Sequence, residues 1–148
     1  MTETWVRAGE PLDPGAVFVR TQVFVEEQGF CHEFDEIDAR ADHLVLYDNG
    51  CPVATGRVFL AGDGAPVPGA CMIGRIAVVR SHRGSGTGRL VMERLLMRAG
   101  KLADCALLDA QVQAIPFYER LGFSVLDPTG EVHYDEHCPH RWMVKQLK

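Results

Sequence analysis

The sequence predicts one mixed α/β domain in which helices flank a largely antiparallel sheet. The order of the segments points to this class, because β-rich runs come first and helical and strand-like runs alternate afterwards. Length agrees with it: 148 residues are close to the usual size of one domain, and no repeat, low-complexity tract or linker divides them. We therefore expect residues 1–148 to form a single domain, with enough hydrophobic residues (47%) to bury a core.

The first expected elements are a short strand over residues 3–8 and a helix over Pro14–Gln28. Val17, Phe24 and Val25 fit one face of that helix, and a proline suits the first turn of a helix. The helix would therefore turn an apolar stripe toward the sheet.

The next segment, Cys31–Asp42, is acidic and has no clear period, so we expect a loop or a short helix there. Two β-rich runs follow, His43–Tyr47 and Pro52–Leu60, and Asn49-Gly50 between them is a strong signal for a hairpin turn. A loop rich in glycine and proline then leads to a third strand, Cys71–Val79.

The second half is expected to alternate helices with strands. A helix begins after Gly88, and Gly100 could interrupt or end it. The apolar side of this helix consists of Met92, Leu95, Leu96, Ala99 and Leu102. The remaining expected elements are a strand over Cys105–Ala110, a short helix over Ala114–Leu121 closed by Gly122, and strands over Phe123–Leu126 and Arg141–Leu147.

Charge and composition argue against several classes of function. The net charge of −5 argues against a nucleic-acid groove. No apolar run approaches about 18 residues, and the N-terminus has no apolar signal segment, so we expect a cytoplasmic protein without a membrane contact. The five cysteines form no C-x-x-C pair and their number is odd, so we expect free thiols rather than disulfides.

Gly84, Gly86 and Gly88 stand between the third strand and the helix that follows. Residues without a Cβ let backbone N–H groups approach an anion, and a helix start adds free amides and a positive dipole end. The stretch therefore fits a phosphate cradle, although a glycine-rich turn that only caps the helix is the plain alternative. The P-loop and dinucleotide patterns are both absent, because no Gly-Lys-Ser/Thr occurs and no third glycine has the required spacing.

The pattern Arg83-x-x-Gly86-x-Gly88, after the strand residues Ile76–Val78, resembles the coenzyme A pyrophosphate loop of the GNAT N-acetyltransferase superfamily. Downstream, residues 117–123 (F-Y-E-R-L-G-F) are similar to the F-Y-E-x-x-G-F segment of the same superfamily. The resemblance implies the GNAT acyl-CoA N-acyltransferase fold, a mixed and largely antiparallel sheet of about six or seven strands flanked by about four helices.

Both ends of the chain resemble the ElaA-like branch of this superfamily. The similar patterns are residues 23–28 (V-F-V-E-E-Q), residues 33–38 (E-x-D-E-x-D), Ala110-Gln111 and Cys138-Pro139-His140. The resemblance therefore covers nearly the whole chain, most strongly in its middle.

The resemblance implies direct transfer of an acetyl group from acetyl-CoA to an amine, without a covalent enzyme intermediate and without a metal. The coenzyme would bind the loop residues Arg83, Gly84, Ser85, Gly86, Thr87 and Gly88 and pair with the strand residues Ile76, Ala77 and Val78. Backbone N–H groups of Ala77 and Val78 would polarise the thioester carbonyl.

Tyr118 matches the tyrosine of the superfamily. The resemblance implies that it contacts the coenzyme and that its phenol protonates the departing sulfur as general acid. A half-buried tyrosine with a structural role is the alternative.

The third strand offers no obvious general base. Many members of the superfamily carry a glutamate there, whereas Arg75 is the only charged residue of this strand. Glu27 and His140 are therefore the expected base candidates and, with Arg75, the expected contacts of the acceptor amine. Glu26, His43 or a chain of water molecules are the alternatives.

Two further clusters have both a functional and a plain interpretation. The carboxylates of Glu33, Asp35, Glu36 and Asp38 could attract a cationic amine, but a solvated acidic loop explains them as well. Residues 133–140 contain metal-ligand types, yet no second spaced pair accompanies them, so we expect no metal.

The leading hypothesis is an acetyl-CoA-dependent N-acetyltransferase that acts on a primary amine of a small molecule or a protein. A catalytically silent acyl-CoA sensor or interaction module with the same fold is the alternative, because the third strand lacks a carboxylate. No nucleic-acid or membrane partner is expected, and a homodimer is compatible with either function.

Overall fold

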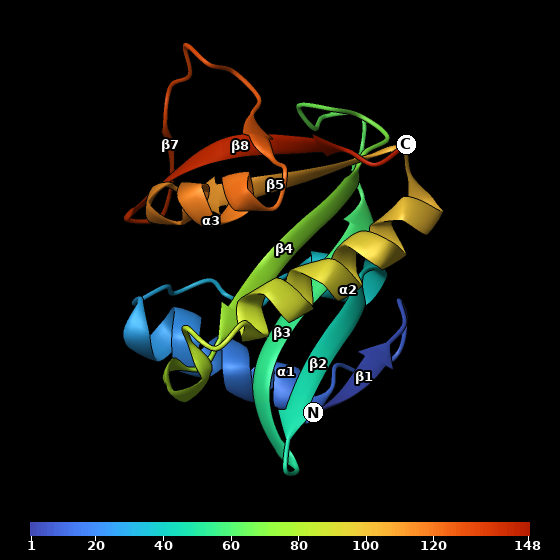
Figure 1. Cartoon of the computed structure of the whole chain (residues 1–148), viewed down its shortest axis with the longest axis vertical. Coiled ribbons are helices and arrows are strands. Elements are labelled where there is room, and N and C mark those ends of the chain that lie inside the picture. The colour runs from blue at the N-terminus through green and yellow to red at the C-terminus, as the bar shows by residue number, and fades with distance from the viewer.

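The computed structural model describes residues 1–148 and contains one eight-stranded sheet (Figure 1). The strands run in the order β1-β2-β3-β4-β5-β8-β6, and β7 also pairs with β8. Their bounds are β1 Thr2–Val6, β2 Asp42–Asp48, β3 Cys51–Leu60, β4 Cys71–Val78, β5 Cys105–Gln111, β6 Ser124–Val125, β7 His133–Asp135 and β8 Cys138–Gln146. The expected class, a mixed and largely antiparallel α/β fold, is confirmed.

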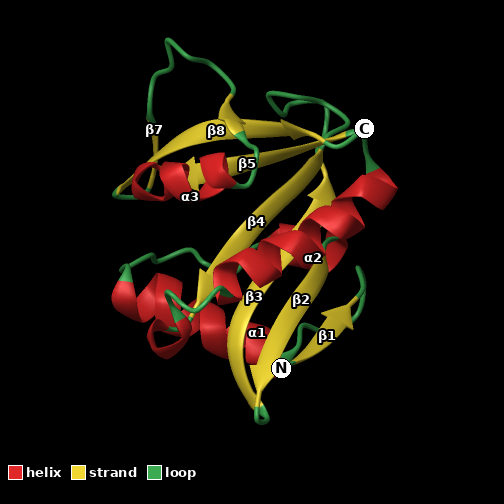
Figure 2. Cartoon of the chain, viewed as in Figure 1, coloured by secondary structure: helices red, strands yellow, loops and turns green.

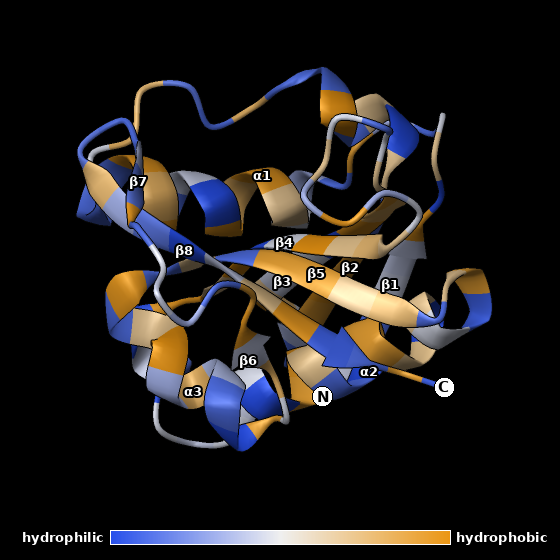
Figure 3. Cartoon of the chain, turned by 90° about the horizontal axis from the view of Figure 1, so that it is seen from above, coloured by the Kyte–Doolittle hydropathy of each residue, from blue (hydrophilic) through white to orange (hydrophobic).

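Three α-helices flank this sheet: α1 Pro14–Arg20, α2 Thr87–Leu102 and α3 Ile115–Arg120. The first continues directly as a π-helix, η1, over Thr21–Glu27, and short 3-10 turns form at η2 Glu36–Arg40, η3 Arg80–His82 and η4 Val112–Ala114. Seen from above in Figure 3, α1 lies on one face of the sheet and α2 and α3 lie on the other. The structure thus has three α-helices where about four were expected, because the acidic segment forms only a 3-10 turn.

Local sequence signals explain where α1 and the first hairpin form. Asp13 caps α1, since its carboxylate accepts a hydrogen bond from Gly15 N–H at 2.7 Å, and Pro14 occupies the first turn. Asn49 and Gly50 have φ values of 50° and 79°, the left-handed pair that a tight β-hairpin turn needs. The expected hairpin between β2 and β3 is therefore confirmed.

The core lies mainly between the sheet and α2, where Met92, Leu95 and Ala99 are fully buried. Gly56 on β3 makes this packing possible, because a Cβ there would lie 2.5 Å from Leu95 Cδ1. Burial of this apolar face also carries α2 past Gly100 to Leu102, so the helix is not interrupted at that glycine.

All neighbouring strands are antiparallel except β4 and β5. These two pair only over Cys71–Ile73 and Ala106–Leu108 and then diverge (Figure 2). Residues Gly74–Val78 of β4 are therefore left without a strand partner on the side that faces β5. The same stretch contains an irregularity in the register with β3, at which Arg75 takes a φ of 52°.

The C-terminal strands differ from the expectation in extent. The strand β8 begins at Cys138 rather than Arg141, and β6 covers two residues rather than Phe123–Leu126. The short strand β7 was not expected, because its sequence, His-Tyr-Asp, has no apolar alternation. It forms because Glu136, at φ 53°, turns the chain back so that β7 can pair with β8.

Candidate active site

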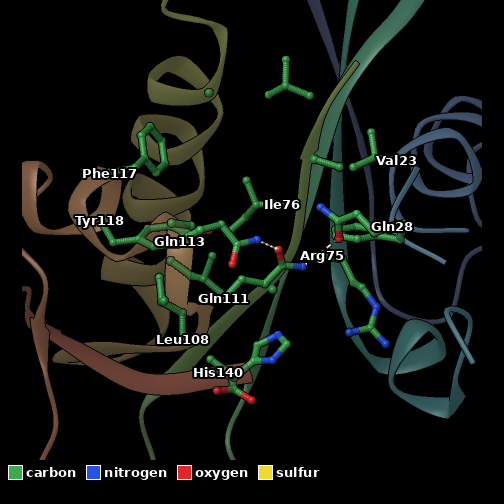
Figure 4. Close-up of a pocket in the computed structure, with 18 of the residues that line it drawn as sticks. Val23, Gln28, Arg75, Ile76, Leu108, Gln111, Gln113, Phe117, Tyr118 and His140 are labelled. Atoms are coloured by element: carbon green, nitrogen blue, oxygen red, sulfur yellow. Dashed lines mark hydrogen bonds between the residues drawn. The ribbon is translucent and has the colours of Figure 1, made fainter. Parts of the chain in front are cut away.

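A cleft of about 650 Å³ opens where β4 and β5 diverge. Figure 4 shows Phe117 and Tyr118 on the α3 side of this cleft and Gln28 and Arg75 on the opposite side. His140 of β8 also lines the cleft. The site is thus built from both faces of the sheet at the point where the sheet parts.

The glycine loop, residues 83–88, leads from β4 to α2. Gly84 and Gly86 have φ values of 77° and 86°, so the backbone itself needs glycine at both positions. Gly88 lies in the first turn of α2, where a Cβ would lie 3.4 Å from the ring of Phe117. Two glycines therefore shape the loop and the third lets α2 approach α3, a role that the phosphate-cradle argument did not include.

The backbone N–H groups from Gly84 to Arg89 find no acceptor in the protein. They surround the N-terminus of the 16-residue helix α2, whose first turn carries no acidic side chain. Free amides and the positive end of a helix dipole attract anions. Since Arg83, Arg89 and Arg120 also line the cleft, this end of it fits a pyrophosphate group.

Glu27, one of the two base candidates, is bound to this loop. Its Oε1 lies 3.0 Å from Arg83 Nη2, and its Oε2 lies 3.0 Å from Arg83 Nη1. Arg80 Nη2 lies 3.6 Å from the same Oε2. The hydrogen bond from Arg83 and the charges of both arginines hold the pKa of Glu27 below its ordinary value. Glu27 does not line the cleft, and a carboxylate with a lowered pKa is a weaker base.

One backbone donor on the open edge of β4 faces the cleft. Val79 N–H donates to Val53 O of β3 at 2.9 Å, so strand alternation turns Ala77 N–H toward β3 and Val78 N–H toward the cleft. Arg83 Nε donates to Val78 O at 2.9 Å, which agrees with this direction. The geometry favours Val78 over Ala77 as a donor to a bound carbonyl.

Tyr118 is 9% exposed and lines the cleft from α3. Its ring packs edge-on against Phe117 and Phe123, with centroids 5.1 and 6.1 Å away. The hydroxyl has no hydrogen-bond partner in the protein, and it is not sealed from the cleft. Burial raises the pKa of Tyr118 above its ordinary value, so the phenol keeps its proton at neutral pH.

His140, the other base candidate, lines the cleft and is 6% exposed. Its Nδ1 lies 2.9 Å from Cys138 O, and a carbonyl oxygen can only accept a hydrogen bond. The proton of the neutral imidazole is therefore on Nδ1, and Nε2 keeps a lone pair. No protein group bonds to Nε2, which leaves it available to a ligand.

Asp109 and His133 form a hydrogen-bonded pair beside His140. His133 Nε2 lies 2.8 Å from both carboxylate oxygens of Asp109 but is aligned to bond only to Oδ2, so the buried Oδ1 has no donor. Burial raises the pKa of Asp109, although the hydrogen bond from His133 opposes this shift. The His133 ring also stacks on Trp142 (5.5 Å) and on His140 (6.2 Å).

The acidic segment is held in a buried ion-pair network rather than in solvent. Arg20 Nε lies 2.8 Å from Glu33 Oε2, and Arg20 Nη1 lies 2.8 Å from Asp38 Oδ1. Arg57 Nη1 lies 2.8 Å from both Asp35 Oδ1 and Asp38 Oδ1. Burial opposes the ionisation of Asp38, but its hydrogen bonds and charge pairs with the arginines outweigh burial and lower its pKa to about 2.

Arg75 closes this network on the cleft side. Its Nε lies 3.0 Å from Glu33 Oε2, and its Nη2 lies 3.2 Å from Asp35 Oδ2. Both interpretations of the acidic segment, a solvated loop and a free attractor for cations, are therefore wrong for Glu33, Asp35 and Asp38, because arginines neutralise these carboxylates.

Three glutamines connect the two sides of the cleft. Gln111 Nε2 donates to Gln28 Oε1 at 2.8 Å, and Gln113 Nε2 donates to Gln111 Oε1 at 2.5 Å (Figure 4). These hydrogen bonds join the end of η1 to β5 and η4. They cross the cleft beyond the point where the backbone pairing of β4 with β5 ends.

The structure brings most of the expected site residues together and leaves a few apart. Those that line the cleft are Arg75, Ile76, Ala77, Val78, Arg83, Gly84, Gly86, Gly88, Tyr118 and His140. Ser85, Thr87 and Glu27 do not line it, and neither do Glu26 and His43, the alternative bases. Sequence reasoning missed Asp109 as a cleft residue, although its charge within the otherwise apolar strand Cys105–Ala110 was a usable signal.

No group of three or more His, Cys, Asp or Glu side chains is arranged to hold a metal ion. This includes the histidines and the cysteine of residues 133–140. None of the helices combines the length and hydropathy that a membrane span needs.

Comparison with known proteins agrees with this geometry. The sequence model of the Acetyltransferase (GNAT) family matches residues 12–123. The uncharacterized N-acetyltransferase YjcF of Bacillus subtilis is 36% identical over 133 residues, which are 88% of this chain and 89% of YjcF.

Solved structures agree as well. An acyl-CoA N-acyltransferase from Pseudomonas aeruginosa superposes with a TM-score of 0.80 and 27% identity, over 98% of this chain and 99% of its own. Escherichia coli ElaA also has a TM-score of 0.80, with 24% identity over 98% of this chain and 100% of its own, which shows a shared fold.

Proposed function

This chain belongs to the acetyltransferase (GNAT) family, and we propose that it transfers the acetyl group of acetyl-CoA directly to a primary amine in the cleft between β4 and β5. Membership of the family supports acyl-CoA N-acyltransferase activity; the acetyl donor and the amine acceptor are the proposed part. One observation carries the proposal. A single cleft contains both a cradle of free backbone amides, Gly84–Arg89, and a buried imidazole, His140, with a free Nε2.

The cradle and its arginines would hold the pyrophosphate of the donor. The amides of Gly84–Arg89 are unpaired, and Arg83 is already fixed by Glu27 and Val78 O. A preset guanidinium loses little freedom when it binds an anion. The unpaired edge of β4, Ile76–Val78, would accept the extended pantetheine arm alongside it, because strand edges pair with extended chains.

The proposed reaction forms one bond and breaks one. The lone pair of a neutral amine attacks the thioester carbon, a C–N bond forms, the C–S bond breaks, and the sulfur leaves with the electron pair of that bond. Negative charge develops on the carbonyl oxygen, where Val78 N–H is the nearest free donor that alternation turns toward the cleft. The proton lost by the nitrogen goes to a base, and the sulfur gains one from an acid.

We assign the base to His140 rather than Glu27. His140 Nε2 keeps a lone pair because Cys138 O accepts the Nδ1 proton, and the ring lines the cleft. Glu27 is ion-paired with Arg83 and lies outside the cleft lining, so its proposed role is to hold Arg83.

The acid assigned to the sulfur is Tyr118. Its hydroxyl has no competing partner, and burial keeps the phenol protonated. A neutral donor in an apolar pocket can give its proton to a developing thiolate.

The proposal is tested by thiol release from acetyl-CoA across a library of primary amines, with propionyl-CoA as a second donor. We expect release that depends on the amine and is faster with the acetyl donor. Release that no amine accelerates would contradict the proposal.

The alternative is a catalytically silent acyl-CoA sensor. The absence of a carboxylate on β4 favours it, because many members of the family carry a glutamate there. Coenzyme A binding measured by calorimetry, without turnover of any amine, would decide for the sensor.

A further inference from the structure

The end of the cleft opposite the glycine loop carries carboxylates that have no role in the proposed acetyl transfer. Strand register places cross-strand partners on one face: Gln111 and His133 both pair with His140, and Asp135 pairs with Cys138. Alternation adds the residues two positions away. We call this set the acceptor face: Asp109, Gln111, His133, Asp135, Cys138, His140 and Trp142.

The acceptor face contains two carboxylates and no lysine or arginine. Asp135 is exposed at the cleft lining and makes no ion pair or side-chain hydrogen bond in the protein. Asp109 has a histidine beside it, but its Oδ1 has no donor. The closest arginine of the opposite wall, Arg75, is already bound by Glu33 and Asp35 and does not compensate them.

His140 is the second and independent sign of a ligand here. It is 6% exposed, its Nε2 has no partner, and it lines the same end of the cleft. A polar atom that reaches a cleft from a largely buried side chain and has no protein partner is available to a ligand or a water molecule. The reacting amine satisfies this atom, but it leaves Asp135 without an ion pair and Asp109 Oδ1 without a donor.

Filling the cleft removes water from these carboxylates. A neutral or apolar acceptor would leave Asp135 without an ion pair and Asp109 Oδ1 without a donor, which is costly. An acceptor with its own carboxylate would in addition bring like charges together. A second ammonium group avoids both costs.

We infer that the acceptor carries a second cationic group on a short chain, as a diamine does; this rests on the proposed acetyl transfer. One nitrogen lies at His140 Nε2 and the other lies at Asp135, on the strand beside it. Cys138, the partner of Asp135, is two residues from His140, so Asp135 and His140 are diagonal neighbours on paired strands, roughly 7–8 Å apart. This spacing is comparable with the extended length of 1,4-diaminobutane.

The test compares three acceptors of equal chain length: 1,4-diaminobutane, butylamine and 4-aminobutanoate. Initial rates of thiol release from acetyl-CoA give kcat/KM for each. We expect the diamine to exceed butylamine by roughly threefold to tenfold, as one ion pair at a part-exposed site allows, and 4-aminobutanoate to be the poorest.

The matched variants are Asp135→Asn, on the acceptor face, and Glu131→Gln, an exposed carboxylate outside the cleft lining. Asp135→Asn should lower the ratio of diamine to butylamine kcat/KM by roughly threefold to tenfold, and Glu131→Gln should leave the ratio unchanged. Equal kcat/KM for diamine and butylamine, or a ratio that Asp135→Asn does not change, overturns the inference and leaves acetyl transfer standing. Failure of all three amines to accelerate thiol release overturns the inference and argues against the proposed function as well.

Discussion

The two ends of the cleft offer a ligand opposite chemistry. Next to α2 and α3, the cleft presents backbone amides, three arginines and the aromatic rings of Phe117 and Tyr118. The acceptor face, linked to the end of η1 through Gln111 and Gln28, presents carboxylates, the His140 imidazole and a glutamine to the cleft. The proposed anionic donor and cationic acceptor would therefore have separate places, and they would meet at the gap between β4 and β5.

The two ends also differ in how they are made. Amides at Gly84–Arg89 point at a ligand because of the backbone path, and they neither titrate nor reorient. The acceptor face depends on side chains such as His140 and Asp109, and burial raises the pKa of Asp109. Changes at the first end should alter donor affinity, whereas changes at the second should alter proton transfer and acceptor choice.

The largest effect is expected at Tyr118, on the α3 side of the cleft. Tyr118→Phe keeps the ring and its contacts with Phe117 and Phe123 but removes the acid. We expect kcat to fall roughly 10²–10⁴-fold, with coenzyme A affinity and thermal stability nearly unchanged. Steady-state kinetics and calorimetry check this, and an intact kcat would assign the hydroxyl to structure.

Removal of the base at the acceptor face should come next. His140→Gln can still accept the hydrogen bond of an amine but cannot take up its proton, so kcat should fall about 10²-fold, at the low end of general-base effects. Steady-state kinetics check this, with coenzyme A affinity expected to stay nearly unchanged. A variant that keeps the wild-type kcat would exclude His140 as the base, and Glu27→Gln is the matched comparison.

The ion-pair network across the cleft from the acceptor face should act on stability rather than on substrate affinity. The pKa of Asp38 is about 2 in the folded protein, below its ordinary value of about 3.9, so ionised Asp38 stabilises the fold at neutral pH by about 2–3 kcal/mol. That contribution is complete above about pH 4–5 and is mostly lost as the pH falls to about 2.

Urea unfolding of the wild type and Asp38→Asn at several pH values tests this. The difference in free energy of unfolding should shrink below about pH 4, while Glu36→Gln, an exposed neighbour, should show no such trend. A difference that does not vary with pH would disprove the role of Asp38, and a raised KM without lost stability would restore the cation-attractor hypothesis.

The smallest effect is expected for a substitution in the glycine loop that keeps the left-handed backbone conformation of Gly86. Asparagine tolerates positive φ better than other residues, so Gly86→Asn adds a side chain at the cradle with limited strain. We expect the Kd of coenzyme A to rise at least about tenfold, the loss of one charge-assisted hydrogen bond. Gly9→Asn, at φ 87° and away from the cleft, is the matched control for strain. Unchanged coenzyme A affinity in a folded Gly86→Asn protein would remove the cradle from the site.

The sequence predicts the two ends of the cleft to different extents, because one is contiguous in sequence and the other is assembled from separate strands. The glycine loop and residues 117–123 are contiguous patterns, so the donor end and Tyr118 could be predicted from local spacing. The acceptor face joins β5, β7 and β8 through sheet register, and β7 carries no apolar alternation that would predict it. His140 was therefore a candidate among several, and Asp109 was not one.

The ion-pair network could not be predicted for the same reason. Glu33, Asp35 and Asp38 form a visible acidic run, but their partners Arg57 and Arg75 come from β3 and β4. Whether an acidic run is solvated or neutralised depends on these distant residues. The fold class was predictable because hydrophobic period and turn residues are local, whereas the π-helical continuation of α1 has no such signal.

The central claim is that one cleft brings an acyl-CoA thioester to an amine. The most direct measurement is mass spectrometry of the acetylated amine formed from acetyl-CoA, in the wild type and in Tyr118→Phe, with coenzyme A affinity measured on the same samples. The account predicts acetylated product in the wild type, and in the variant an unchanged affinity with product formed roughly 10²–10⁴-fold more slowly. Wild-type protein that binds coenzyme A but forms no acetylated amine would contradict it.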